Sequence, residues 1–390
     1  MIRDYRAFVS ATLAALLLSG VSASAFDTRA SAAFVLDEKT GTVLLAKNAD
    51  VPLPPASMSK LMTLYIAFEA VRDGRLRMDE ELLVSAHANS FGGSTLFLRQ
   101  GERVTVEDLI RGVIVLSGND ASVVLAEALS PDGTEAGFSR MMTQRAQQLG
   151  MSNSIFKNSS GWPADGHVMS MRDLTLLAQR IIEDFPDFYE MFAETEFLFD
   201  EAESSNRFNR NPLLPLNIGA DGLKTGHTQE AGYGLVGSAK QGERRVIFTI
   251  TGLDTARARS EESEAIVNWA FRQFAEKTVT RAGEVIAQAD VWMGASDTVG
   301  LMAKEDVTLL LPSTPGQDVT AEVVYTGPIE APIAEGRQLA ELIISPEGLP
   351  EHRIPLYAAS AVPASGFLSR MMSVSQVLMG RLQAPAEETM

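Results

Sequence analysis

A serine and a lysine three positions apart, Ser57 and Lys60, are the pair in this sequence best suited to nucleophilic catalysis. The sequence predicts that a helix begins near Ser57. Residues three apart share one face of a helix, so the Lys60 amine can reach the Ser57 hydroxyl. A lysine that is partly desolvated beside other cations has a lowered pKa and can take the serine proton. The unpaired backbone N–H groups of a helix N-terminus can also bind a developing oxyanion. The pattern indicates acyl transfer through a serine.

This motif, S-x-x-K, is not specific by itself, because the chain contains it twice. S-x-N and K-T-G also occur twice each, and context separates the copies. Ser154 and Lys157 lie in a polar stretch that does not open a helix. Residues 204–206 lie in a charged run, and residues 39–41 belong to a tight turn. The remaining members occur in one order along the chain, with room between them for helices: Ser57/Lys60, Ser117/Asn119 and Lys224/Gly226.

Composition argues against two other classes of function. Acidic residues number 50 against 33 lysines and arginines, which gives a net charge of −17. A phosphate backbone would repel such a protein, so we expect no nucleic-acid partner. The chain has no cysteine, and its histidines are far apart and form no metal-ligand motif: His87, His167, His227 and His352. We therefore expect no bound metal and no cofactor.

The predicted elements place these residues in a helical region between two sets of strands. Alternating apolar runs predict strands, and apolar residues at helical spacing predict helices. Strands are expected at 32–36, 42–46, 233–239 and 244–251, and helical segments at 57–74, 104–150, 170–185 and 260–274. One sheet built from both ends of the domain around a helical middle is an α+β arrangement.

Both ends of the chain carry features outside this domain. Residues 1–25 have a weakly basic start, an apolar run and the small-residue site Ala-Ser-Ala, which predicts a signal peptide cleaved before Phe26. The apolar run is short of the roughly 20 residues that span a bilayer. We expect the first domain to cover residues 26–276 and a small β-rich domain to cover 277–358.

Residues 359–390 are expected to form a linker and an amphipathic helix. An apolar stripe at helical spacing runs through Phe367, Met371, Val374, Leu378 and Leu382. Arg370 and Arg381 are the charges of this stretch, a local excess of positive charge on an acidic protein. This make-up is typical of a helix that lies on anionic lipid. The alternative is a helix packed on its own domain or on a partner.

The three motifs resemble those of penicillin-binding proteins and serine β-lactamases. The chain is more closely similar to the low-molecular-mass D-alanyl-D-alanine carboxypeptidases, over residues 32–382. The likeness is carried by PASMSKLMT at 55–63, LSGNDA at 116–121 and DGLKTGHT at 221–228, with 158–167, 209–211 and 269–271. Trp162 and residues 170–174 differ slightly from the residues usual in this family. The resemblance implies a penicillin-binding or β-lactamase-like α+β domain with a small all-β domain after it.

The resemblance also implies roles for the motif residues. Ser57 would be the acylated nucleophile and Lys60 its general base. Asn119 would hold the substrate amide, and Ser117 would relay protons. Lys224 would lie on an edge strand and supply positive potential.

Further residues would bind the substrate. Thr225 and Gly226 would lie against it, with Thr225 meeting its carboxylate. The backbone N–H groups of Ser57 and His227 would form the oxyanion hole. Arg210 is a candidate for holding the terminal carboxylate, since a planar guanidinium suits that group. Arg259 is a second candidate, with a structural salt bridge as its alternative.

The resemblance implies a serine-type D-alanyl-D-alanine carboxypeptidase that acts on peptidoglycan stem peptides and is acylated by β-lactams, and the signal pattern predicts that it is exported. We expect it in the periplasm, attached to the outer face of the cytoplasmic membrane by lipid contacts of residues 367–382. The alternatives are a serine β-lactamase, a D,D-endopeptidase and a catalytically silent wall-binding protein. No E-x-x-L-N segment of the kind that deacylates lactams occurs between Asn119 and Lys224. The intact Ser57 and Lys60 argue against a silent protein.

Overall fold

The structure is a computed structural model that describes residues 4–7, 26–313, 319–346 and 349–366. It divides into two compact units. One spans Phe26–Arg272, and the other contains the residues from Gln273 onward together with residues 4–7. Each unit has its own hydrophobic core.

A five-stranded antiparallel sheet forms one layer of the first unit, in the order β3-β2-β8-β7-β6. Its strands are β2 (Ala32–Asp37), β3 (Thr42–Lys47), β6 (Ala220–Thr228), β7 (Gly232–Gln241) and β8 (Arg244–Leu253). The N-terminal hairpin therefore pairs with strands from the end of the unit, through the β2–β8 ladder. β6 is an edge strand, so no strand of this sheet pairs with its outer side.

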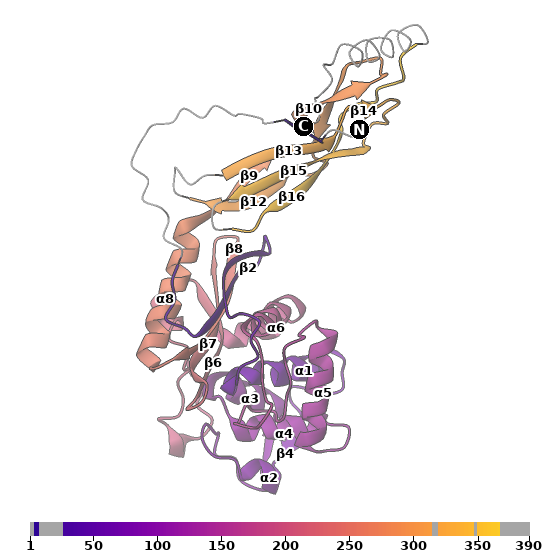
Figure 1. Ribbon diagram of the computed structural model, residues 1–390. Helices are drawn as coiled ribbons and strands as arrows, with labels where there is room; N and C mark the ends of the chain where they lie inside the picture. The colour runs from indigo at the N-terminus through magenta and orange to yellow at the C-terminus, as the bar shows by residue number, and fades with distance from the viewer. Residues whose placement is uncertain (1–3, 8–25, 314–318, 347–348, 367–390) are drawn as a thin grey trace, which may run out of the picture. The chain divides into compact units, whose positions relative to one another are not determined.

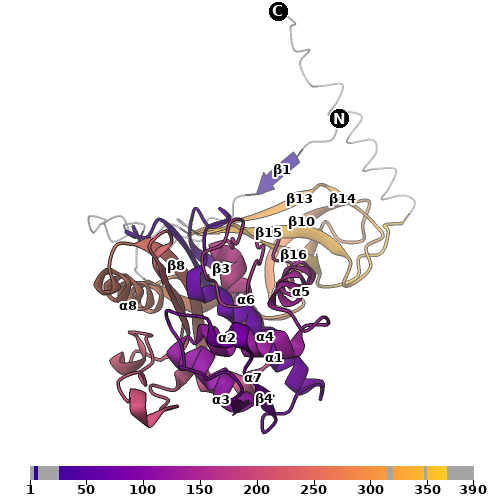
Figure 2. The same ribbon diagram turned by 90° about the horizontal axis from the view of Figure 1, so that it is seen from below.

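Helices cover both faces of this sheet. α8 (Ala256–Gln273) lies on one face, and the helical middle of the chain lies on the other (Figures 1 and 2). The helices of the middle are α1 (Lys60–Arg72), α2 (Ala86–Asn89), α3 (Val106–Arg111), α4 (Asn119–Leu129), α5 (Glu135–Gln148), α6 (Met171–Asp184) and α7 (Pro186–Tyr189). A two-stranded sheet of β4 (Glu81–Leu83) and β5 (Arg103–Thr105) flanks them. The core between sheet and helices includes Leu61, Leu64 and Phe68 of α1.

Two helical predictions need correction in detail. Ser57 does not open α1. It lies in a 3₁₀ turn, Ala56–Ser59, and the α-helix begins at Lys60. The helical pattern from 104 to 150 is broken into α3, α4 and α5, because Ser117 adopts a left-handed conformation (φ 62°) and Thr134 caps a new helix at Gly137 N–H. A π-helical turn, Gly112–Leu116, leads into the first break.

The described residues of the second unit form strands and no helix, as predicted for the small β domain. Its seven-stranded sheet has the order β1-β13-β15-β16-β11-β10-β14, and β12 and β9 form a separate pair. The strands are β1 (Asp4–Ala7), β9 (Phe274–Thr280), β10 (Val285–Trp292), β11 (Thr298–Met302), β12 (Val307–Pro312), β13 (Val319–Thr326), β14 (Ile329–Glu330), β15 (Gln338–Pro346) and β16 (His352–Ala358). Alternate residues of β15 are buried, as in a sheet with one packed face. The predicted α+β domain followed by a small β domain is confirmed.

Two predicted terminal features lie mostly or wholly beyond the described residues. Most of the signal peptide, residues 8–25, and the whole amphipathic segment 367–382 belong to this part of the chain. Among the helices that the structure does describe, none has the length and apolar character needed to cross a bilayer.

Candidate active site

The serine and lysine of the first S-x-x-K motif meet at the start of α1. In a 3₁₀ turn the side chains of residues i and i+3 lie almost directly above one another, so the turn Ala56–Ser59 brings Lys60 over Ser57. Lys60 Nζ lies 2.9 Å from Ser57 Oγ. Ala56, just before the serine, has a positive φ of 49°, a conformation that costs energy for a residue with a Cβ. The strain lies at Ala56 and not at Ser57, and the structure around the turn must hold it in place.

Lys60 is fully buried and contacts three oxygen atoms. Besides Ser57 Oγ, its Nζ lies 2.7 Å from Asn119 Oδ1 and 2.6 Å from the Ser160 carbonyl oxygen. The pKa of Lys60 is lowered to about 7, mainly by burial and next by the positive charge of Arg210. A neutral amine keeps two N–H donors, which suffice for Asn119 and Ser160, and has a lone pair left for the Ser57 proton. The contacts therefore suit a base at the serine.

The S-x-N motif lies where the π-helical turn ends and α4 begins. Ser117 is buried, and its positive φ ends the π-helical turn two residues before Asn119, whose Oδ1 contacts Lys60. The Asn119 backbone N–H donates to Ser94 O at 2.7 Å, and its side-chain amide donates to Gly92 O at 2.8 Å. These bonds fix both the backbone and the side chain of Asn119. One amide hydrogen and one carbonyl lone pair of Asn119 still remain for a substrate.

A loop from 158 to 162 supplies the third oxygen at Lys60. Asn158 Oδ1 accepts the backbone N–H of Gly161 at 2.8 Å and that of Trp162 at 3.1 Å, which folds the loop into a tight turn. Thr63 of α1 donates to the Ser159 carbonyl at 2.7 Å and ties the loop to the helix. The Ser160 carbonyl is the functional contact that sequence reasoning missed. A backbone oxygen leaves no residue signature, and the side chain that signals the turn is Asn158.

His167 joins the same loop to the serine turn. Its Nε2 lies 3.0 Å from Ser59 Oγ, and only 4% of the residue is exposed. The pKa of His167 is lowered to about 4, mainly by burial and next by the charges of Lys60 and Lys157. The imidazole is therefore neutral near pH 7 and acts as a structural hydrogen-bonding partner. In the sequence, His167 is one of four scattered histidines and the last residue of the stretch 158–167 that resembles the family.

The K-T-G motif lies on the edge strand β6, next to the serine turn. A Cβ built on Gly226 would lie 3.0 Å from both Met58 Cγ and Pro55 O, so glycine allows the strand to approach this closely. Thr225 is buried beside it. Burial and then three neighbouring cations lower the pKa of Lys224 well below its usual range: Lys60, Arg210 and Arg259. Of these basic groups, the two arginines keep their charge at working pH, and this positive potential favours a carboxylate ligand.

Arg210, Arg259 and His227 make different contacts at this site. The Arg210 guanidinium donates through Nη1 to Ser94 Oγ, and the carbonyl oxygen of the same Ser94 accepts the backbone N–H of Asn119. Arg259, on α8, donates through Nη2 to the Arg210 carbonyl at 3.4 Å and lies over the Tyr233 ring. Tyr233 in turn stacks on His227 with 3.8 Å between ring centroids. Arg259 thus supports the residues at the cleft and contacts no carboxylate in the described structure.

The second copies of the motifs lie elsewhere and have structural partners. Ser154 Oγ donates to Asp173 Oδ2 at 2.7 Å in a buried contact at the start of α6. Asn206 donates to the Thr95 carbonyl at 2.9 Å, and residues 39–41 form the turn between β2 and β3. Within the described ranges, no group of three or more histidine, aspartate or glutamate side chains is arranged to hold a metal ion.

The sequence of this chain is similar to two protein families and to several known proteins. Residues 19–255 match a family model described as D-alanyl-D-alanine carboxypeptidase, and residues 274–364 match one described as the C-terminal domain of penicillin-binding protein 5. The chain is 32% identical over 347 residues to the D-alanyl-D-alanine carboxypeptidase DacF of Bacillus subtilis, covering 87% of each chain.

Two solved structures are similar to this chain in fold as well as in sequence. Penicillin-binding protein 5 of Haemophilus influenzae is 31% identical, with a TM-score of 0.68, over 87% of this chain and 98% of that one. The ampicillin-bound form of penicillin-binding protein D2 of Listeria monocytogenes is 34% identical, with a TM-score of 0.57, over 63% of this chain and 98% of that one.

Proposed function

Because this chain belongs to the D-alanyl-D-alanine carboxypeptidase family, we propose that it removes the terminal D-alanine from peptidoglycan stem peptides through an acyl-enzyme on Ser57. It is a serine-type carboxypeptidase, a hydrolase of the penicillin-binding kind. The observation that carries the proposed chemistry is the contact of 2.9 Å between Ser57 Oγ and a fully buried amine whose pKa is about 7.

Acylation begins with transfer of the Ser57 proton to neutral Lys60. The Ser57 oxygen then attacks the carbonyl carbon of the penultimate D-alanine and forms a tetrahedral intermediate. The backbone N–H groups of Ser57 and His227 stabilise the oxyanion. When the C–N bond breaks, the leaving amine takes the proton from Lys60 by way of Ser117. Free D-alanine departs, and the peptide stays esterified to Ser57.

The substrate peptide lies along the edge of β6 as an added strand. This mode uses the outer backbone groups of β6, which no other strand of the sheet pairs with. Thr225 and Lys224 receive the terminal carboxylate in the positive region of the cleft, and Arg210 pairs with the same group. Asn119 binds the amide on the other side of the scissile bond. Gly226 keeps the strand close to Ser57.

Water then hydrolyses the ester, and Lys60 acts again as the base. β-Lactams acylate the same serine, a proposal that agrees with the ampicillin-bound relative from Listeria monocytogenes. The described residues contain no E-x-x-L-N segment between Asn119 and Lys224, so we propose slow release of the lactam rather than efficient lactamase turnover. A D,D-endopeptidase reaction on cross-linked peptides would use the same residues.

We further propose that the protein is exported and works at the membrane surface. The signal pattern of residues 1–25 supports export with maturation before Phe26. The apolar stripe in 367–382, with Arg370 and Arg381, supports contact with anionic lipid in the periplasm. The proposed catalytic domain, 26–276, and β domain, 277–358, precede the linker at 359.

The assignment of Ser57 is tested by covalent labelling. The intact protein is incubated with a penicillin and its mass is measured, and release of D-alanine from a dipeptide-terminated substrate is followed in parallel. Ser57→Ala should show neither the added mass nor D-alanine release, whereas Ser154→Ala, the matched change in the second S-x-x-K motif, should retain both. Labelling that survives in Ser57→Ala and disappears in Ser154→Ala would assign the nucleophile to the other motif.

A further inference from the structure

Glu135 is a nearly buried carboxylate that belongs to none of the motifs and takes no part in the chemistry described above. It is the first residue of α5, where Thr134 caps the helix by accepting the Gly137 N–H at 3.0 Å. Phe138 and Met142 of the same helix belong to the core of the first unit, so the start of α5 is fixed in place. Only 11% of the Glu135 side chain is exposed. Burying a carboxylate costs free energy unless the group is hydrogen-bonded, so its contacts indicate what it holds.

Glu135 holds the loop that supplies the third oxygen at Lys60. Its Oε1 accepts the backbone N–H of Ser159 at 3.0 Å and the Ser159 hydroxyl at 2.6 Å. The Ser159 carbonyl accepts a hydrogen bond from Thr63 of α1 at 2.7 Å, so every polar group of Ser159 ties it to α1 or α5. The next carbonyl along the chain, that of Ser160, lies 2.6 Å from Lys60 Nζ. One peptide bond joins the two serines, so the contacts of Ser159 fix the Ser160 carbonyl as well.

Glu135 also acts on Lys60 through its charge. The pKa of Lys60 is lowered to about 7 by burial first and then by Arg210. The negative charges of Asp120 and Glu135 act in the opposite direction and raise this pKa. A substitution that removes the charge of Glu135 and keeps its shape should therefore lower the pKa of Lys60 further. A residue with only a structural role would have no such effect.

The other charged groups near Glu135 lie toward the surface. His87 Nε2 of α2 lies 3.0 Å from Glu135 Oε2, and the His87 side chain is 52% exposed. On the chain segment of Glu135 itself, Asp132 forms an ion pair with Arg140 at 2.7 Å. The inner oxygen of Glu135, Oε1, thus binds the loop, and the outer oxygen, Oε2, faces a surface histidine.

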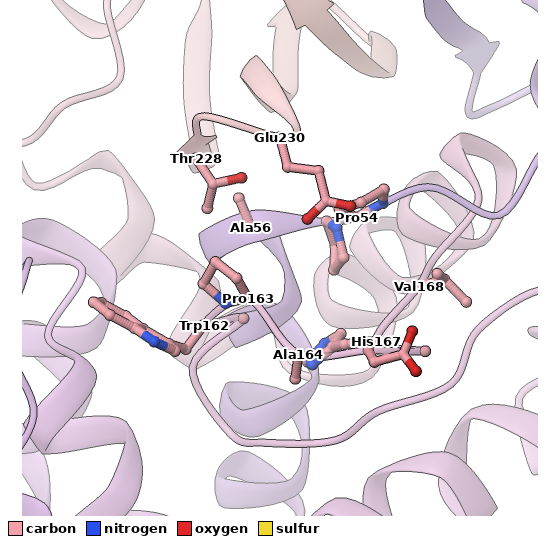
Figure 3. A pocket seen from close by; sticks show the side chains of 13 residues that line it. Pro54, Ala56, Trp162, Pro163, Ala164, His167, Val168, Thr228 and Glu230 are labelled. Atoms are coloured by element: carbon pink, nitrogen blue, oxygen red, sulfur yellow. The ribbon is translucent and has the colours of Figure 1, made fainter.

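Glu135 lies away from the cavity next to the serine turn. Beyond Ser160 the loop continues through Trp162, Pro163 and Ala164, whose side chains line this cavity of about 530 Å³ (Figure 3). Glu135 is not among the residues that line it. It therefore acts on the reaction through the loop and through its charge, and not by contact with a substrate in this cavity.

We propose that Glu135 is a positioning residue for the general base, because it holds the loop 158–162 so that the Ser160 carbonyl stays on the Lys60 amine. A displaced loop would remove one of the three oxygen contacts that orient the amine toward Ser57. The proposal rests on the proposed function and adds a residue that the motifs do not contain.

Asp173 offers a matched control, because it holds an earlier part of the same chain segment in the same way. Its Oδ2 accepts the backbone N–H of Asn153 at 2.8 Å and the Ser154 hydroxyl at 2.7 Å. Asp173 is also buried, but it is not one of the charged groups that shift the pKa of Lys60. Asp173→Asn therefore shows what the loss of a buried, loop-holding carboxylate does to the fold alone.

The test follows penicillin acylation of Ser57 in the full chain between about pH 5 and 9. Glu135→Gln keeps an oxygen that can accept both hydrogen bonds from Ser159, but it carries no charge. Its rate at high pH should stay close to that of wild type, and the midpoint of its profile should move to lower pH, so that acylation at the acidic end is faster than in wild type. Glu135→Ala removes the hydrogen bonds as well and should lower the rate at high pH by more than about tenfold. Asp173→Asn should leave the midpoint unchanged.

The exposed partner of Glu135 requires one further comparison. Histidine changes its charge near neutral pH, so the profiles are also measured in a His87→Gln background. The shift caused by Glu135→Gln should persist there, because it comes from the charge of Glu135 and not from that of His87.

Three results would overturn the role of Glu135 and leave the proposed function standing. One is an unchanged midpoint in Glu135→Gln, the second is an equal shift in Asp173→Asn, and the third is acylation of Glu135→Ala at the wild-type rate. Thermal unfolding checks that each variant is folded. If folded wild-type protein is neither acylated at Ser57 nor able to release D-alanine, the proposed function itself fails, and the role of Glu135 fails with it.

Discussion

The lowered pKa of Lys60 makes the proposed chemistry depend on pH. The amine must be neutral to accept the Ser57 proton, and its pKa is about 7. The acylation rate should therefore rise with pH through about 7 and level off above it, and should fall about tenfold per pH unit well below it. The measurement is the second-order rate constant of penicillin acylation between pH 5 and 9. A flat profile over this range would contradict Lys60 as the base.

Replacing Lys60 by arginine distinguishes two roles of this residue, since arginine keeps the positive charge but cannot act as a base. A guanidinium stays protonated at working pH and cannot accept a proton. Lys60→Arg should therefore lower acylation by about two to four orders of magnitude, nearly as much as Lys60→Ala. Thermal unfolding checks that both variants fold, since Lys60 is fully buried. Substantial activity in folded Lys60→Arg would transfer the role to another group, with Lys224 the first to examine.

Arg210 can be tested through the charge of the substrate. Loss of a charge-assisted contact to a carboxylate in the cleft costs about 2 kcal/mol, or roughly 30-fold in rate. Arg210→Ala should lower kcat/KM by that factor for a peptide with a free terminal carboxylate, and much less for its amide. Equal losses on both substrates would remove Arg210 from the carboxylate site. Because Arg210 also lowers the pKa of Lys60, the pH profile of the variant should shift upward.

Residue types and their order supplied the candidate residues of this site but not their contacts. Ser57 and Lys60 are close in sequence, so their contact could be argued from helical spacing alone. Asn119 and Lys224 come from distant elements, so they were grouped with Ser57 by the order of the motifs and by the resemblance to a known family, and not by spacing. The Ser160 carbonyl and the support of Arg210 by Arg259 could not be predicted, because a backbone acceptor can belong to any residue type.

The loop 158–162 is the element on which the geometry at Lys60 depends most directly. Gly161 has a φ of 75°, and a Cβ there would lie 1.8 Å from the Ala56 carbonyl oxygen. Gly161→Ala should thus force the loop away from the serine turn and move the Ser160 carbonyl from Lys60. We expect a clearly lowered melting temperature and a loss of more than about tenfold in acylation, the low end of what a misplaced catalytic group costs.

Gly41 offers a matched control for this substitution. It also has a left-handed backbone, with φ 66°, but no atom lies within 4 Å of a Cβ built on it. Gly41→Ala should show only the conformational cost, about 1 kcal/mol, and unchanged acylation. If Gly161→Ala matched Gly41→Ala in both melting temperature and acylation rate, the loop would not position Lys60.

The periodicity of apolar residues predicted the helices and strands well where that periodicity is regular. It predicted them less well at the candidate site, where functional residues interrupt the pattern. The hairpin β2–β3 and the pair β7–β8 agree with the predicted strands within a few residues. β6 was not predicted from pattern, because its sequence, ADGLKTGHT, is glycine-rich and polar. The break after α3 was missed for a similar reason, since the left-handed φ of Ser117 serves the site rather than the helix.

At the scale of the whole molecule, charge is distributed unevenly along the sequence. The chain carries a net charge of −17, yet the only charges between residues 366 and 382 are Arg370 and Arg381. An acidic surface would be repelled by an anionic membrane, so any attachment must come from a segment that differs from the rest. The two structural units have separate cores. Attachment and catalysis are therefore expected to be separable by truncation.

Truncation after Ser365 should remove the proposed membrane association, so that the protein stays in the supernatant, with unchanged hydrolysis of a small soluble peptide. The apolar stripe from 367 to 382 is short, so binding to lipid should be reversible. High salt should weaken the association of the full chain without abolishing it, because screening removes only the contribution of Arg370 and Arg381. Co-sedimentation with vesicles of anionic and of neutral lipid measures both effects. Persistent sedimentation of the truncated protein would place the anchor elsewhere, and a collapse of its peptidase activity would mean that the terminal segment supports the catalytic unit, Phe26–Arg272.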